Sequence, residues 1–538
     1  MANNYNNLSK DELLKVIDKL KSRKKYGIVW EEERIKEQFE KESENALPVL
    51  REIKNKEIIT NSSYGVNILI EGDNYHVLSV LNYTHQNAID LIYIDPPYNT
   101  GNNDFKYNDS YVDKEDGYRH SKWLSFMNKR LRLAKNLLKD EGVIFISIDD
   151  NEYAQLKLLM DEIFYEDNFI GTVVRRRRKS QANLSKNLST IHEYLLCYQK
   201  SSRAKLYKTS DAIQKDSYKN PDKDPRGPYV TMPCSNKGGA LYEIITPTGK
   251  KYTDEWRFKE ETYNKLLSEK RIAFPDKGNG KPRYKLFLNE KMDSGVIPNT
   301  WWDDVASNQE ATRELKNLFG GELVLDNPKP LGLIKQIIKL VIKSEGIVLD
   351  FFAGSGTTGH AVLEVNKENN WNIKFILSTN NENNICTEVC YPRIEKAIEG
   401  YKTVSKEEIV GLKGNLKYFK TSFVKKTLNQ DQNKINITTK CTEMLCLKEG
   451  IFNLVKEADD YRIFNQDNRI MAVYYSFLND SIKDLKKQLD RIEGKKILYC
   501  FTLDAFGLDK NNFIDWDDVI LEPIPQKILD VYEEIYEY

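Results

Sequence analysis

The chain has 538 residues, more than one hydrophobic core usually organises, so we expect several domains. Lysine and arginine together number 81, as do aspartate and glutamate, which excludes a global positive charge that would attract a polyanion. The sequence contains neither an apolar run of about 18 residues nor an N-terminal signal pattern, which excludes a membrane-spanning protein and predicts a cytoplasmic one without a membrane partner.

The chain begins with lysine- and glutamate-rich sequence in residues 1–60, where apolar residues recur at helical spacing. We predict an N-terminal helical segment there.

Residues 61–170 then alternate short apolar runs with helical stretches such as 123–138. The predicted strands are residues 66–70, 91–94 and 143–148. This alternation is typical of an α/β domain with a largely parallel sheet.

The rhythm breaks between residues 171 and 325, where aromatic, basic and Pro/Gly-containing sequence predicts an inserted domain with irregular β structure. Its densest basic run, Arg175–Lys179, is either a phosphate contact or a solvated face. Further candidates for nucleic-acid contact, each of which could equally lie at the surface or in a core, are Lys237, Trp256, Arg257, Lys281 and Arg283. Regular α/β sequence returns in residues 326–404 and completes the sheet, and residues 405–538 are predicted to form a separate C-terminal domain.

The segment Asp350–Gly359 reads Asp-Phe-Phe-Ala-Gly-Ser-Gly-Thr-Thr-Gly and lies where a predicted strand turns into a helix. Its Gly354 and Gly356 would let a ligand approach the backbone closely. The third glycine of the dinucleotide fingerprint is not at the expected spacing, and the chain contains no phosphate-loop sequence. By itself the segment is either a cofactor loop or only a tight turn.

A second motif, Asp95-Pro96-Pro97-Tyr98, directly follows the predicted strand 91–94. Two consecutive prolines fix the backbone and leave carbonyl acceptors without N–H donors. The carboxylate of Asp95 and a rigid carbonyl could hold both hydrogens of an exocyclic amino group, and Tyr98 could stack on a base that has left the duplex. An ordinary turn at a strand end would also explain the motif alone.

Together, and in this order, the two motifs resemble the beta-class amino methyltransferases of DNA. Flanking sequence extends the resemblance to residues 68–74, 326–330 and 375–382. It implies a Rossmann-like methyltransferase fold, an α/β fold in circularly permuted beta-class order, with an inserted target-recognition domain and a C-terminal α+β domain. The catalytic half would be residues 61–170 and the cofactor half residues 326–404.

The resemblance also implies S-adenosylmethionine as cofactor. We expect no metal, because the closest cysteine pairs, Cys386/Cys390 and Cys441/Cys446, lack nearby histidines. The residues that would line its methionine part are Asp350, Phe351, Phe352, Gly354, Ser355, Gly356 and Thr357. Asp73 would meet the adenine end, and Glu382 the ribose hydroxyls, for which Asn380 and Asn381 are alternatives. Lys329 lies in an Asn-Pro-Lys-Pro stretch that resembles the family segment closing over the cofactor.

The pattern is closer still to the modification subunits of type III restriction systems. The matching stretches are residues 142–152, 297–305, 411–421 and 441–446. This resemblance implies that residues 171–325 read a short asymmetric site on double-stranded DNA. It also implies that residues 405–538 form a homodimer and dock an ATP-dependent restriction (Res) subunit.

The reaction expected from this resemblance is methyl transfer to the N6 amino group of adenine, with Asp95, Pro96, Pro97 and Tyr98 as the catalytic motif. Cytosine N4 presents the same two hydrogens and remains an alternative, as do an orphan methyltransferase, an RNA- or glutamine-methylating enzyme and a catalytically silent DNA-specificity subunit. Methylation at cytosine carbon 5 would need a cysteine nucleophile, and the only Pro-Cys pair, Pro233-Cys234, lies in the insertion without a companion motif.

Overall fold

The computed structural model describes residues 45–537, except 62–63, 103, 108–109, 179–187, 211–212, 214 and 505–506, together with residues 28, 30 and 41. The chain divides into two compact units, one formed by Met1–Lys205 and Thr300–Tyr538 and the other by Leu206–Asn299. We describe the two units separately.

The larger unit is built on a ten-stranded sheet. In spatial order its strands are β1 (Ala46–Glu52), β19 (Asn415–Lys425), β2 (Val66–Glu71), β16 (Asn372–Thr379), β15 (Glu345–Asp350), β3 (Ile89–Ile94), β6 (Leu138–Ile148), β8 (His192–Gln199), β7 (Phe169–Arg176) and β14 (Trp301–Trp302). The six strands from β19 to β6 are mutually parallel, whereas β8 runs antiparallel to both β6 and β7. The predicted parallel α/β sheet is therefore present.

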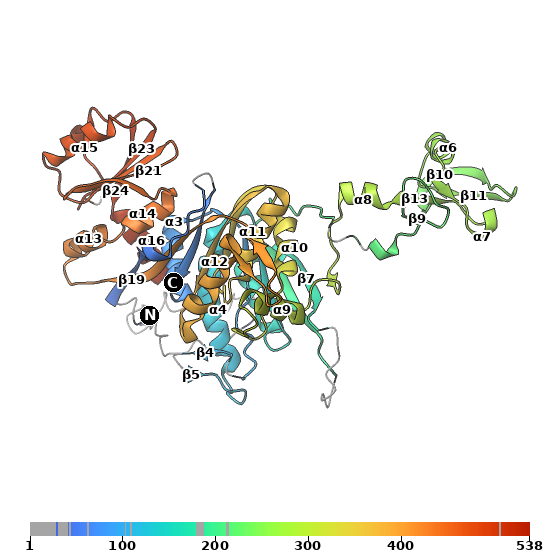
Figure 1. Cartoon of the computed structure of the whole chain (residues 1–538), viewed down its shortest axis with the longest axis horizontal. Coiled ribbons are helices and arrows are strands. Elements are labelled where there is room, and N and C mark those ends of the chain that lie inside the picture. Colours follow the sequence, from blue (N-terminus) through green and yellow to red (C-terminus); the bar gives the residue numbers. More distant parts are fainter. Residues whose placement is uncertain are drawn as a thin grey trace, which may run out of the picture. The chain divides into compact units, whose positions relative to one another are not determined.

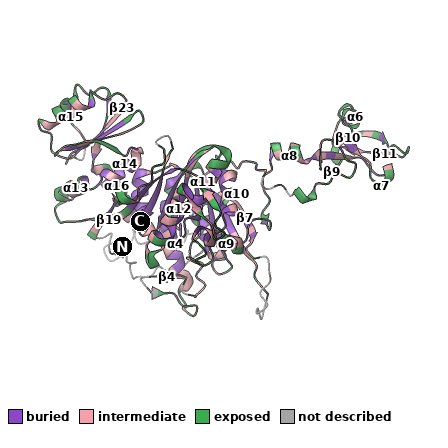
Figure 2. Ribbon diagram, in the orientation of Figure 1, coloured by how far each residue is buried: buried purple, intermediate pink, exposed green. Residues whose placement is uncertain are grey.

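Helices cover both faces of this sheet. They are α3 (Asn74–Thr84), α4 (Arg119–Leu137), α5 (Tyr153–Phe164), α9 (Asn308–Leu318), α10 (Leu331–Val341), α11 (Thr357–Asn369) and α12 (Tyr391–Glu399). Along β3, Ile92 and Ile94 join the core that includes α3 and α4, while Leu91 and Tyr93 are buried on the opposite face. Apart from Asp90 near its start, the strand is apolar because neither face meets water. Figure 2 shows the buried residues of these strands in purple.

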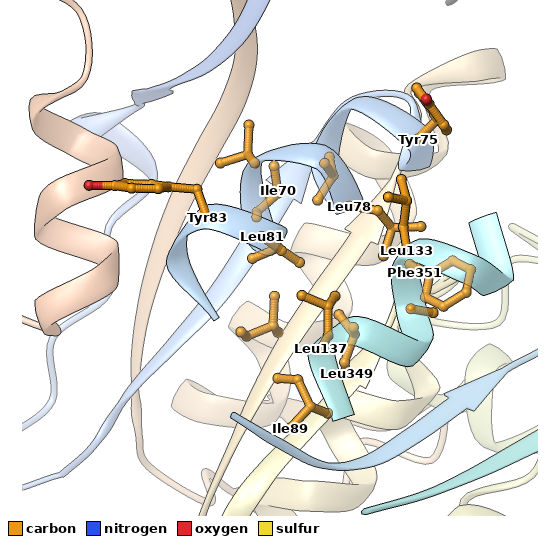
Figure 3. Packing of buried hydrophobic residues seen from close by; sticks show 14 of the residues in the cluster. Ile70, Tyr75, Leu78, Leu81, Tyr83, Ile89, Leu133, Leu137, Leu349 and Phe351 are labelled. Carbon is orange, nitrogen blue, oxygen red and sulfur yellow. The ribbon is translucent and has the colours of Figure 1, made fainter. Parts of the chain in front are cut away.

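The core between the sheet and helices α3 and α4 is continuous (Figure 3). Leu78 and Leu81 of α3 meet Leu133 and Leu137 of α4 over the sheet residue Leu349, and all five are almost fully buried. A fully buried leucine side chain contributes about 1.5–3 kcal/mol by leaving water, so this layer fixes the positions of the strand ends that carry the motifs.

The C-terminal region forms a second sheet, which has five strands. Its elements are β20 (Asn453–Glu457), β21 (Tyr461–Gln466), β22 (Arg469–Tyr474), β23 (Lys495–Phe501), β24 (Val519–Ile524), α13 (Gln430–Thr438), α14 (Thr442–Glu449), α15 (Ser481–Leu489) and α16 (Gln526–Glu537). The predicted boundary at residue 405 is too early, because β19 belongs to the ten-stranded sheet. Helices α14 and α16 pack against α3, and the Tyr532 hydroxyl donates to the Pro48 carbonyl over 2.5 Å, so this region shares the main core.

The smaller unit, Leu206–Asn299, has its own core around Cys234, Ile244, Trp256 and Tyr263. Its elements are β9 (Tyr229–Pro233), β10 (Ser235–Ile245), β11 (Lys251–Trp256), α6 (Glu260–Ser268), β12 (Ile272–Ala273), α7 (Pro275–Gly278), β13 (Arg283–Phe287) and α8 (Leu288–Ser294) (Figure 1). The unit is narrower than the predicted insertion 171–325, because β7 and β8 complete the main sheet and α9 belongs to the larger unit.

The prediction of a helical segment over residues 1–60 is also wrong in part. Residues 46–52 form β1, which pairs antiparallel with β19 at the edge of the main sheet. Its residues Leu47, Val49 and Leu50 are buried. The predicted helical spacing over residues 13–20 lies outside the described residues. Two short hairpins are also present, β4 (Lys106–Tyr107) with β5 (Ser110–Tyr111) and β17 (Gly400–Lys402) with β18 (Glu408–Val410). No helix among the described residues is long and apolar enough to cross a membrane.

Candidate active site at the carboxyl edge of the sheet

Four adjacent parallel strands bring the two sequence motifs together. In the order β2, β16, β15 and β3, these strands are neighbours and run in the same direction. Asp73 follows β2, Glu382 follows β16, Asp350 ends β15 and Asp95 follows β3. Since parallel strands carry their carboxyl ends to one edge, residues up to about 300 positions apart share that edge, where open α/β sheets bind ligands.

The Asp95 motif leaves one carboxylate oxygen and one carbonyl available. Asp95 Oδ1 accepts a hydrogen bond from the Tyr98 hydroxyl over 2.9 Å. The Pro97 carbonyl accepts one from Trp123 Nε1 over 2.7 Å, and Trp123 is fully buried. Within the described part of the chain, no hydrogen bond reaches Asp95 Oδ2 or the Pro96 carbonyl. These two acceptors belong to adjacent residues.

Lys329, predicted to close over the cofactor, lies against the Asp95 motif. Its Nζ is 2.9 Å from Asp95 Oδ1, donates to the Tyr98 hydroxyl over 2.8 Å and is 3.5 Å from Glu193 Oε2. Burial alone would lower the pKa of Lys329, but the Asp95 and Glu193 carboxylates outweigh burial and raise it. Burial raises the pKa of Asp95, and the Lys329 ammonium opposes that rise.

The carboxylate of Asp350 holds the glycine loop rather than facing outward. Its Oδ1 accepts from the Phe352 N–H over 3.0 Å and its Oδ2 from the Thr358 hydroxyl over 2.5 Å. Burial raises the pKa of Asp350 to about 7, although both hydrogen bonds oppose the shift. Gly354 and Gly356 both have positive φ, 51° and 79°, which glycine adopts without strain. Among the described residues, nothing accepts a hydrogen bond from the Gly354 or Ser355 N–H.

A buried arginine that the sequence did not indicate holds the glycine loop from the side of the protein interior. Arg393 of α12 is 1 % exposed, and its Nη1 donates to Ser355 Oγ over 3.0 Å and to Thr357 Oγ1 over 2.8 Å. Burial lowers the pKa of its guanidinium to about 10. The hydroxyls of Ser355 and Thr357 therefore point into the protein, and only their backbone remains to meet a ligand. No sequence motif near residue 393 signals this contact.

The residues predicted for the adenosine end are more exposed. Asp73 caps α3, because its Oδ1 accepts from the Tyr75 N–H over 2.7 Å, and its Oδ2 lies 3.5 Å from the buried Arg130 Nη2. Glu382 is 41 % exposed and pairs with Lys106. The side-chain oxygen of Asn381, in contrast, accepts hydrogen bonds from two backbone N–H groups of the next helical turn. All three predicted ribose ligands thus have a partner, because the Asn380 side-chain oxygen accepts from the Glu382 N–H over 3.4 Å.

Two residues predicted to contact DNA are instead buried. Arg175, the first residue of the basic run, is fully buried and forms an ion pair with Glu193. Trp256 is 1 % exposed in the core of the smaller unit, where its Nε1 donates to the Tyr242 carbonyl over 2.8 Å. For both residues the sequence left a core position open, and the structure has that position, because charge and aromaticity in a sequence do not say which face of a strand carries the side chain.

A second polar cluster adjoins the Asp95 motif. Glu152 is fully buried, and its Oε1 accepts from Asn99 Nδ2 over 2.6 Å and lies 2.7 Å from His120 Nδ1. Burial raises the pKa of Glu152 to about 8. At neutral pH this carboxyl is therefore mostly protonated, and it holds Asn99, the residue directly after Tyr98, in a left-handed conformation with φ 56°.

Comparison with known proteins identifies the family. The family model described as DNA methylase (N6_N4_Mtase) matches residues 89–389, which include both motifs. This match covers more than half of the chain. The protein belongs to the DNA methylase family.

Three relatives illustrate how far the likeness to other DNA methylases extends. The type III restriction-modification enzyme StyLTI Mod subunit of Salmonella typhimurium strain LT2 is 42% identical over 343 residues, covering 58% of this chain and 52% of that protein. The EcoP15I Mod subunit of Escherichia coli is 33% identical over 57% of this chain and 58% of its own length. The type II methyltransferase M.KpnI of Klebsiella pneumoniae is 33% identical, covering 63% of this chain and 86% of that protein. The aligned part thus spans only about half the length of the first two relatives.

Proposed function

We propose that this DNA methylase transfers a methyl group from S-adenosylmethionine to the N6 amino group of adenine in duplex DNA, and that its fold follows the circularly permuted beta-class order. One observation carries the proposal: the available Asp95 Oδ2 and Pro96 carbonyl lie at the end of β3, and the strand next to β3, β15, leads into the glycine loop. Acceptor recognition and cofactor binding thus occupy neighbouring strand ends.

The residues present fit the cofactor. The free Gly354 N–H can meet a carboxylate at the start of α11, and a Cβ added at Gly354 would meet no atom closer than the Phe352 carbonyl at 3.9 Å, so a ligand has room there. Asp73 and Glu382 supply carboxylates at the other two strand ends for adenine and ribose. S-adenosylmethionine supplies an activated methyl group.

The chain itself contributes positioning. An amino group offers two hydrogens, and the Asp95 carboxylate and the Pro96 carbonyl are two acceptors on a backbone stiffened by two prolines. Lys329 and Tyr98 hold Asp95 Oδ1, which orients Oδ2 toward the incoming amino group. Tyr98 offers its ring as a stacking surface for the base. Orientation of this kind lowers the barrier without covalent chemistry by the protein.

For target recognition we propose the unit Leu206–Asn299. It contains 18 lysine and arginine residues against 13 aspartate and glutamate residues, although the whole chain is electrically balanced. Such local excess positive charge supports binding to phosphates. The likeness to Mod subunits supports a type III system, in which the protein would form a homodimer and bind a Res subunit.

The alternative at cytosine carbon 5 lacks a nucleophile in the described part of the chain. Cys234 is fully buried in the core of the smaller unit, and burial raises the pKa of its thiol to about 11. A buried neutral thiol cannot attack a base. Methylation of cytosine N4 remains an outcome that the experiment below distinguishes.

The test uses purified protein, labelled S-adenosylmethionine and unmethylated genomic DNA, with modified bases mapped by single-molecule sequencing. Asp95→Asn removes the charged acceptor. Asp90→Asn is the matched control, because Asp90 lies at the other end of the same strand and pairs with Lys139 over 2.7 Å. Methylated adenine in one short motif, lost only with Asp95→Asn, supports the proposal. Modified cytosine replaces the base assignment, and no transfer by the wild type refutes the enzyme function.

A further inference from the structure

A line of four charged side chains runs from the Asp95 motif, which follows β3, to strands β8 and β7 on the far side of β6. Lys329 Nζ lies between Asp95 Oδ1 at 2.9 Å and Glu193 Oε2 at 3.5 Å. Glu193 in turn forms an ion pair with Arg175, which lies directly opposite it in the β7–β8 register. Lys329 is 8 % exposed, Glu193 1 % and Arg175 0 %. Two cations and two anions thus alternate and balance in charge.

Burying an isolated charge is strongly unfavourable. A buried cluster of charged side chains is therefore stable only where each charge has a partner of opposite sign. Here the pairing is specific. Lys329 donates to the Tyr98 hydroxyl, lies 2.9 Å from the Asp95 carboxylate and forms an ion pair with Glu193 Oε2 at 3.5 Å, and that oxygen accepts no hydrogen bond from the described residues. Glu193 is itself held by Arg175, whose Nη2 also donates to the Ala306 carbonyl over 2.6 Å. The Lys329 side chain, otherwise flexible about four bonds, is thereby confined.

We propose that Glu193, held by Arg175, is a positioning residue that fixes the Lys329 ammonium on Asp95 Oδ1 and so presents Oδ2 to the substrate amino group. This inference rests on the proposed function, because the acceptor role of Asp95 is part of it. Glu193 and Arg175 act through Lys329 and do not touch the substrate. The basic run that resembled a DNA-binding face therefore begins with a residue that serves the catalytic motif.

The charges around Asp95 give the inference a signature in pH. The Lys329 ammonium lowers the pKa of Asp95, whereas Glu193 raises it. Glu193 also raises the pKa of Lys329. The remaining groups facing the Asp95–Lys329 pair are Tyr98, Tyr93, Asp350 and Arg175, and Arg177 faces Glu193. Removing the charge of Glu193 therefore lowers the pKa values of Asp95 and Lys329 together. Removing Lys329 raises that of Asp95.

The experiment compares the wild type with Glu193→Gln and Lys329→Met in single-turnover methyl transfer over a range of pH. For Glu193→Gln we expect both limbs of the pH–rate profile to move to lower pH, and a loss in maximal rate of about 100-fold, the effect of a misplacement near 1 Å. For Lys329→Met the acid limb should move the other way. Glu52→Gln is the matched control, because Glu52 pairs with Lys417 over 2.6 Å on β1, several strands from the motif.

Because Glu193→Gln leaves Arg175 unpaired and could unfold the protein, Arg175→Gln combined with Glu193→Gln provides a second, charge-balanced variant. It should keep the wild-type unfolding temperature and still lose rate. The protonation of Asp95 is read directly, without turnover, as the infrared carbonyl stretch that Asp95→Asn abolishes. In Glu193→Gln this stretch should titrate at lower pH than in the wild type.

The outcomes separate the inference from the proposed function. An unshifted infrared titration and pH profile in Glu193→Gln overturn the inference, as does a rate equal to that of Glu52→Gln. If the wild type transfers no methyl group, the proposed function fails, and the infrared titration alone then decides whether Glu193 governs the Asp95–Lys329 pair.

Discussion

Exchanging each of the two loop glycines for alanine should have different effects. In Gly354→Ala the new Cβ meets no atom closer than 3.9 Å, so its cost to folding is the left-handed backbone alone, about 1–2 kcal/mol. In Gly356→Ala the Cβ would lie 3.1 Å from Cys390 Sγ and 3.3 Å from the Cys390 carbonyl. Crowding of that kind adds about 1–3 kcal/mol to the same backbone cost. Gly356→Ala should therefore destabilise the fold more.

Cofactor affinity should follow the opposite order. The space beside Gly354 is where we propose that S-adenosylmethionine approaches, so a methyl group there should weaken binding by about 1–3 kcal/mol, or roughly 5-fold to 150-fold. Isothermal titration calorimetry with S-adenosylmethionine measures this, and urea unfolding of the free protein measures the stability. Unchanged affinity in Gly354→Ala, or a greater loss of affinity in folded Gly356→Ala, would refute the placement of the cofactor.

Three further predictions concern other parts of the protein. Trp123→Phe leaves the Pro97 carbonyl without its donor, so it should cost about 1–3 kcal/mol in urea unfolding and lower kcat more than cofactor affinity. Burial raises the pKa of Glu152 to about 8. Its contribution to the free energy of unfolding is therefore fully present below about pH 4.5 and is lost as pH rises through 8, by about 1.4 kcal/mol per pH unit between these values. Glu152→Gln should flatten this pH dependence of unfolding. Replacing residues 206–299 by a short linker should abolish DNA binding in a gel-shift assay yet leave S-adenosylmethionine affinity intact, because that unit has a core of its own.

Patterns local in sequence predicted the central elements well. The runs 66–70, 91–94 and 143–148 fall within β2, β3 and β6, since continuous apolar runs bounded by turns are typical of strands buried on both faces. The resemblance to DNA methylases is confirmed by the family match. Individual roles of the site residues stay predictions, although the sheet brings Asp73, Asp95, Asp350 and Glu382 to one edge.

Long-range pairing could not be predicted in the same way. Residues 46–52 were predicted to be helical together with the rest of residues 1–60, yet they form strand β1 because they pair with the edge of β19, more than 360 positions away. The predicted insertion is too wide because β7 and β8 each carry a charged residue at one end. These residues, Arg175 and Glu193, form an ion pair. A single sequence shows both charges but not that they face each other.

The contacts missed by the sequence analysis share one physical character. Trp123 holds the Pro97 carbonyl, Arg393 holds the hydroxyls of Ser355 and Thr357, and Glu193 faces the ammonium of Lys329. Each of these three side chains is buried and lies on a helix or strand outside the loop that it contacts. The loop itself keeps its ligand-facing groups free. A loop that must present unpaired acceptors to a substrate cannot satisfy itself locally, so its rigidity has to come from buried partners elsewhere in the fold. Substitution of these partners should therefore change the rate of methyl transfer although none of them touches the reacting atoms.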